Sequence, residues 1–320
     1  MTNVTVGVDI KEEVNDLGVN GKGVGLSPRK AVGRSALFLL ILMVATNFVG
    51  FICVGLLHGK NVGPDEYTKL TTALTMVVEV VVVAIVCWYC RWRACGKRRE
   101  GGNLSAHPTH HDAMTIGRLL MLFAMLAAVM MLETASGELV QFGVHAAGSS
   151  AANPISSVSD LAQNTWYIWL FMCVVGPVCE ELLFRGAILR TLRQYGEVFA
   201  VVTSSVLFAL FHGNAFQLQV VLLGLLLGYV TCRYSIKYAI GLHVVNNVLA
   251  SMLSDIPDLA LWVVGGVCLV AALIAYYAYR GVQKSQWIPN APHVYRAWLS
   301  PLFLILVVLM IVEIVLQLVM

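Results

Sequence analysis

The chain has 320 residues, of which 58% are hydrophobic and only 12% are charged, and its mean hydropathy is +0.78. A soluble globular domain carries roughly 25% charged residues, so too few polar side chains are present here to cover a water-facing surface, and a water-soluble protein is excluded. The net charge of +3 is too small to indicate binding to nucleic acid.

Long apolar runs predict an all-α, polytopic transmembrane helical bundle. A hydrocarbon core of ~30 Å is crossed by about 20 helical residues, and backbone groups in lipid have to pair within their own segment. We expect about nine membrane helices (8–9). In chain order the apolar segments lie at roughly 36–57, 70–90, 117–135, 164–184, 197–212, 215–233, 238–254, 259–279 and 298–319.

The polar stretches divide the chain into four regions. Residues 1–33 are expected to form a flexible cytoplasmic tail, and 34–163 contain the N-terminal membrane helices with an external loop at 133–163. Residues 164–254 form a core that carries the polar motifs, and 255–320 contain the C-terminal membrane helices.

Basic residues predict the orientation of the bundle. Lys and Arg precede the first apolar segment and lie in every second gap after it, whereas the 133–163 loop contains neither. Because Lys and Arg are enriched in cytoplasmic loops, we expect the N-terminus inside and the C-terminus outside. The expected location is the plasma membrane of a bacterium, as a multi-pass integral protein.

The first polar motif is GPVCEELLFRG at residues 176–186. Glu181 and Arg185 are four residues apart on a predicted helix and are expected to pair. Glu180 is turned by roughly 100° from Glu181, which leaves one carboxylate for chemistry. The alternative interpretation is a charged helix end at the cytoplasmic interface.

Two further motifs follow at helical spacing. Phe208 and His212 share one face of the fifth segment, and His243 and Asn247 share one face of the seventh, with Asn246 about 100° away. Ionisable and polar side chains at membrane depth are costly and usually functional. The alternatives are an interfacial histidine and polar side chains that bind helices together.

A helical hairpin is predicted to bring the first two motifs together. Glu180 lies 16 residues before Gly196 and His212 lies 16 residues after it. At 1.5 Å per residue both stand roughly 24 Å from the turn. A carboxylate and an imidazole at one depth on neighbouring helices could share a water molecule.

The three strings, in this order, resemble the signature of the CaaX-protease and bacteriocin-processing family (CPBP, also called Abi) of intramembrane endopeptidases. That signature reads EExxxR, FxxxH and HxxxN, and the resemblance covers about residues 164–254. It implies water activation by two residues, Glu180 and His212, and stabilisation of the oxyanion by two more, His243 and Asn247. The supporting residues are Glu181, Arg185, Phe208 and Asn246.

From the motifs and the resemblance we expect an intramembrane endopeptidase that hydrolyses a peptide bond of a membrane-associated or lipid-anchored peptide. Its partners would be that substrate and the lipid bilayer, without nucleic acid. No cofactor is expected. A zinc-dependent version would use Glu180, His212 and His243 as ligands and leave one position open for water.

Two other classes of function stay open. A non-enzymatic immunity or scaffold protein would be favoured by a degraded site, and a transporter by inverted repeats or broken helices. Glu79 and Glu313 are expected to face other helices or a wet crevice, and the cysteine- and histidine-containing stretch 87–112 has no assigned role.

Overall fold

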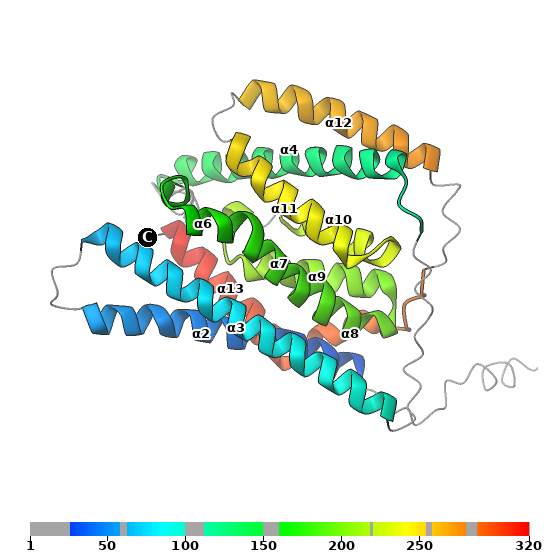
Figure 1. The fold of residues 1–320 in the computed structure, drawn as a ribbon, viewed down its shortest axis with the longest axis horizontal. Coiled ribbons are helices and arrows are strands. Elements are labelled where there is room, and N and C mark those ends of the chain that lie inside the picture. Colours follow the sequence, from blue (N-terminus) through cyan, green and yellow to red (C-terminus); the bar gives the residue numbers. More distant parts are fainter. Residues whose placement is uncertain are drawn as a thin grey trace, which may run out of the picture.

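The computed structural model describes residues 26–57, 63–99, 112–149, 160–217, 220–253, 258–279 and 287–319. Within these ranges the chain forms helices joined by short turns, without a strand (Figure 1). The long helices are α2 (Pro28–Leu57), α3 (Pro64–Arg99), α4 (Ile116–Ala146), α9 (Glu197–Phe211), α10 (Val220–Arg233), α11 (Ile236–Leu253), α12 (Asp258–Tyr279) and α13 (Pro301–Val319).

Between α4 and α9 the chain forms one nearly continuous helical pass with changing winding. Its pieces are α6 (Trp166–Leu170), the π-helical η1 (Phe171–Val175), α7 (Gly176–Glu181), the π-helical η2 (Leu182–Leu189), α8 (Arg190–Leu192) and the 3₁₀ turn η3 (Arg193–Tyr195). Two short 3₁₀ turns complete the fold, η4 (Ala215–Gln217) and η5 (Val294–Leu299).

Length and hydropathy make this an integral membrane protein. Among the described residues six helical stretches are long and apolar enough to cross a membrane, and three shorter apolar helices lie at Glu197–Phe211, Val220–Arg233 and Trp262–Tyr277. The polytopic all-α fold predicted from the sequence is therefore confirmed. The count of nine membrane helices stays a prediction, because three of the nine are short.

The helices run roughly along one direction in three groups (Figure 1). Helices α4 and α12 pack on each other at one side, and α2, α3 and α13 lie at the other. The pass from α6 to α8, with α9, α10 and α11, fills the middle. The main hydrophobic core joins this middle group to α2 and α13, and contains the fully buried Phe184, Phe199 and Phe208.

Two predicted boundaries are wrong. Residues 28–33, assigned to the tail, begin α2, because the small side chain of Ala31 is fully buried and Gly33 lies directly against Ser300. The predicted 133–163 loop begins with the last turns of α4, where the hydroxyl of Ser136 donates to the Leu132 carbonyl (2.6 Å) and needs no water. Residues 1–25 and 150–159 lie outside the described ranges.

The turn before α9 is fixed by a distant segment. Gly196 has φ +134°, and a Cβ atom there would lie 2.2 Å from Oδ1 of Asn290. That oxygen accepts the backbone N–H of Phe199 (3.1 Å), and the carboxylate of Glu197 accepts the N–H of Ile288 (3.1 Å). The predicted hairpin around Gly196 is present, with the segment before η5 holding its turn.

Candidate active site

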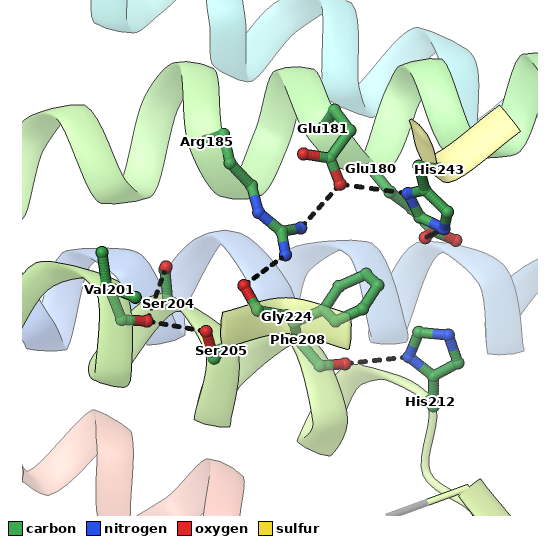
Figure 2. A network of polar contacts seen from close by, with 10 residues as sticks. All are labelled: Glu180, Glu181, Arg185, Val201, Ser204, Ser205, Phe208, His212, Gly224 and His243. Atoms are coloured by element: carbon green, nitrogen blue, oxygen red, sulfur yellow. Dashed lines mark hydrogen bonds and ion pairs between the residues drawn. The ribbon is translucent and has the colours of Figure 1, made fainter. Parts of the chain in front are cut away.

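A buried ion pair forms the centre of the polar network in Figure 2. Glu181 ends α7 and Arg185 lies one turn later in η2, and both side chains are fully buried. Nη1 of Arg185 donates to Oε1 of Glu181 (2.8 Å), and Nη2 donates to the carbonyl of Gly224 in α10 (3.0 Å). The predicted pairing of these two residues is present, and it also binds η2 to α10.

His243 of α11 lies between two neighbouring glutamates. Its Nδ1 is 3.0 Å from Oε1 of Glu181, and its Nε2 is 3.6 Å from Oε2 of Glu180. Because the Glu181 carboxylate already accepts from Arg185 and can only accept again, Nδ1 of His243 is the donor. Nε2 of a neutral His243 therefore carries the lone pair that faces Glu180.

The two glutamates differ in their access to water. The Glu181 side chain is 0% exposed, whereas that of Glu180 is 17% exposed. Glu181 thus serves the buried pair, and Glu180 is the carboxylate that a water molecule or a substrate can reach. The sequence predicted, from the turn between adjacent helical residues, that the two carboxylates point in different directions.

His212 follows the last residue of α9 and lies on the same side of Phe208 as His243 (Figure 2). Its Nδ1 is 2.9 Å from the carbonyl oxygen of Phe208, which can only accept, so Nδ1 carries the proton. Nε2 of a neutral His212 is then free to accept a proton or a hydrogen bond.

The phenyl ring of Phe208 separates and orients the charged and aromatic groups. Its centroid is 4.8 Å from that of His212 and 5.7 Å from that of His243, both edge to face. The guanidinium carbon of Arg185 lies 4.6 Å from the same centroid. One fully buried ring therefore sets the positions of two imidazoles and one cation.

The asparagines of the third motif bind helices together. Nδ2 of Asn247 donates to the backbone carbonyl of Met172 in η1 (2.8 Å), and Nδ2 of Asn246 donates to Oδ1 of Asn247 (3.3 Å). The structure thus gives Asn247 a partner in the helix that carries Glu180. An amide has two N–H donors, so one remains after the bond to Met172.

Two carboxylates outside the motifs lie beside the site. Glu79 of α3 is half-buried and interacts electrostatically with Glu180. Glu313 of α13 lies against Gly213, the residue after His212, where an added Cβ would be 3.3 Å from its carboxylate. Their presence in apolar helices was the available signal, since a carboxylate at membrane depth is rarely placed without a function.

The residues of the site do not fit a metal ion as they stand. Among the described side chains, no group of three His, Cys, Asp or Glu residues is gathered closely enough to hold one. Glu180 and His243 face each other, and the bond of His212 Nδ1 to the Phe208 carbonyl leaves Nε2 as its only available ligand atom. In the 87–112 stretch, the side chains of 92–99 and residues 100–111 lie outside the described parts.

Comparison with known proteins identifies one family. Residues 162–249 match the family model described as "Type II CAAX prenyl endopeptidase Rce1-like". No curated protein and no solved structure matches the chain. The matched segment contains all three motifs, from Glu180 to Asn247, which confirms the resemblance drawn from them. The match supports protease activity of the CAAX type in general.

Proposed function

We propose that this chain is an intramembrane endopeptidase acting on a membrane-associated or lipid-anchored peptide, because residues 162–249 are similar to type II CAAX prenyl endopeptidases. One observation carries the proposal. Glu180 is the partly exposed carboxylate of a network whose other ionic members, Glu181, Arg185 and His243, are buried on three neighbouring elements.

Glu180 acts as the general base in this proposal. It takes a proton from a water molecule, and the water oxygen forms a bond to the carbonyl carbon of the peptide. Nε2 of His212, which has no proton in the neutral ring, accepts a hydrogen bond from the second O–H of that water and orients it. The ion pair of Glu181 and Arg185 keeps its charges and holds His243 in place.

The tetrahedral intermediate then carries a negative oxygen. In its doubly protonated form His243 donates to this oxygen from Nε2, while Nδ1 stays bound to Glu181. The remaining N–H of Asn247 is the second donor, and one such donor is worth ~3 kcal/mol in the transition state. When the C–N bond breaks, Glu180 passes its proton to the leaving amine.

A zinc-dependent version of the same site is the second candidate. It would need Glu180, His212 and His243 to move together, with Nε2 of His212 as the ligand atom while Nδ1 keeps its bond to the Phe208 carbonyl. Metal analysis of the purified protein, with cleavage measured before and after chelation, separates the two versions. Stoichiometric zinc and loss of cleavage on chelation would favour the metal version.

The orientation of the bundle is part of the proposal. The start of α2 contains Arg29, Lys30 and Arg34, and α8 with η3 contains Arg190 and Arg193. The start of α2 and α8 lie at the same end of the bundle (Figure 1). We assign this end to the cytoplasm of a bacterial cell. A cysteine introduced at Gln194 should react with a membrane-impermeant thiol reagent only in inverted vesicles, and one at Ala147 only in intact cells.

The substrate can be found by comparing membrane proteomes. Cells carrying the wild type should contain a peptide or protein terminus that is missing from cells carrying Glu180→Gln. Glu138→Gln is the matched control, because Glu138 is an exposed carboxylate on α4. Identical proteomes from all three strains would support a non-enzymatic scaffold or immunity protein instead.

A further inference from the structure

One backbone carbonyl beside the site has no donor in its own helix. In η1 the N–H of Gly176 donates to the carbonyl of Phe171, five residues earlier. The next N–H would serve Met172, but residue 177 is proline and has none. The N–H of Gly176 would donate to the Met172 carbonyl in an α-helix, but here it is already bound to the Phe171 carbonyl. An unpaired carbonyl at membrane depth costs several kcal/mol.

The side chain of Asn247 supplies the missing donor. Its Nδ2 lies 2.8 Å from the Met172 carbonyl oxygen. On the next residue, Sγ of Cys173 contacts the backbone carbonyl of Asn247 at 3.7 Å, and one turn away Nε1 of Trp169 donates to Oγ of Ser251 (3.0 Å). Helix α11 is thus bound at successive turns to the part of the helix that precedes Pro177.

The winding of η1 decides which face of the helix carries the glutamates. A π-turn contains one residue more than an α-turn, and one extra residue rotates everything that follows by roughly 100°. Glu180 and Glu181 lie three and four residues after Pro177 in α7, so their direction depends on the π-turn being kept. Both face His243, which precedes Asn247 by one turn of α11.

We propose that Asn247 is a positioning residue, whose side-chain amide replaces the N–H that Pro177 lacks and so holds the π-turn that directs Glu180 and Glu181 toward His243. This role uses one N–H of Asn247 and is separate from the donation to the oxyanion. It predicts that Asn247 contributes less to stability when residue 177 has its own N–H, because in a π-turn that N–H donates to the Met172 carbonyl, five residues earlier.

A double-mutant cycle in thermal unfolding tests this coupling without a substrate. Asn247→Leu keeps the size of the side chain and removes the donor. It should lower the Tm of the purified protein by about 3–6 °C, and by less than half as much in a Pro177→Ala background. Pro177→Ser provides a second background with the same restored N–H.

Ser251→Ala is the matched control, because it removes another bond between α11 and the same helix. Its effect on Tm should be equal in all backgrounds. The positioning role is overturned if Asn247→Leu costs the same with proline, alanine or serine at residue 177.

A cleavage assay adds a readout that a purely structural role would not move, and it rests on the proposed peptidase function. Asn247→Leu should lower kcat with little change in KM. Pro177→Ala should recover only part of the lost kcat, because leucine also removes the proposed oxyanion donor, which residue 177 cannot replace. A double variant that regains stability but none of the lost kcat would show that the π-turn does not direct the glutamates for cleavage. If the wild type cleaves nothing, the proposed function fails, and the unfolding cycle still decides the inference.

Discussion

Oε1 of Glu181 lies 3.0 Å from Nδ1 of His243 and joins α7 to α11 at the centre of the bundle. The same oxygen accepts a hydrogen bond from Arg185 in η2, so one buried atom connects α7, η2 and α11. This contact joins the first motif to the third. The imidazole is held in one tautomer, and its second nitrogen is left facing Glu180.

Glu181→Gln should lower the stability of the fold and change the shape of the site only slightly. Arg185 would keep its buried charge without a carboxylate, and breaking a buried pair in this way costs about 3–5 kcal/mol. We expect a clearly lower Tm in detergent micelles. Arg190→Gln, an exposed cation in the same helical pass, is the control and should leave Tm unchanged.

Phe208→Leu should impair cleavage beyond its effect on stability. The shorter side chain leaves a space in the core, which costs about 1–3 kcal/mol, and it removes the ring that both imidazoles touch. Cleavage per folded molecule should fall at least tenfold. Phe142→Leu, on the exposed face of α4, serves as the control. Unchanged cleavage by Phe208→Leu would show that the ring only fills space.

Glu79→Gln should stabilise the protein. Burial of its carboxylate in an apolar helix removes the solvation of that group, and the like charge of Glu180 adds repulsion. Removing the charge of Glu79 should raise stability by about 0.5–2 kcal/mol. The gain should shrink in a Glu180→Gln background, because the repulsion is already absent there. An equal gain in both backgrounds would place Glu79 outside the influence of Glu180.

Gly196→Ala should loosen the hairpin that carries the site. Its φ of +134° is strained for any side chain, and the new Cβ would overlap Asn290. A cost of about 1–3 kcal/mol follows from the backbone alone. Thermal unfolding should show it, whereas Gly143→Ala in α4, where nothing lies within 4 Å of the added atom, should stabilise the helix by up to ~1 kcal/mol.

Local spacing predicted the contacts that depend on a single helix. The pair of Glu181 and Arg185 follows from their separation of four residues, and the greater exposure of Glu180 follows from the turn between neighbours. The contact of Glu181 with His243 could not be predicted, because it depends on the height of α11 against α7. That height is set by packing between segments 62 residues apart in sequence.

The π-helical winding of the central helical pass also could not be predicted from a regular helical pattern. The spacing of the apolar residues predicts regular α-helical winding, whereas η1 and η2 are π-helical on both sides of α7. Gly176 and Pro177 were the local signal, since an internal proline has to be accommodated by a change in backbone hydrogen bonding. The bond from Asn247 to Met172 depends on that change and was therefore missed.

Cleavage of a lipid-anchored peptide by purified protein in bilayer vesicles, compared between wild type, Glu180→Gln and Glu138→Gln, tests the central claim most directly. The wild type and Glu138→Gln should release product at equal rates, and Glu180→Gln should release none while unfolding at a Tm close to the wild-type value. Wild-type rates from Glu180→Gln would contradict the assignment of this carboxylate as the base.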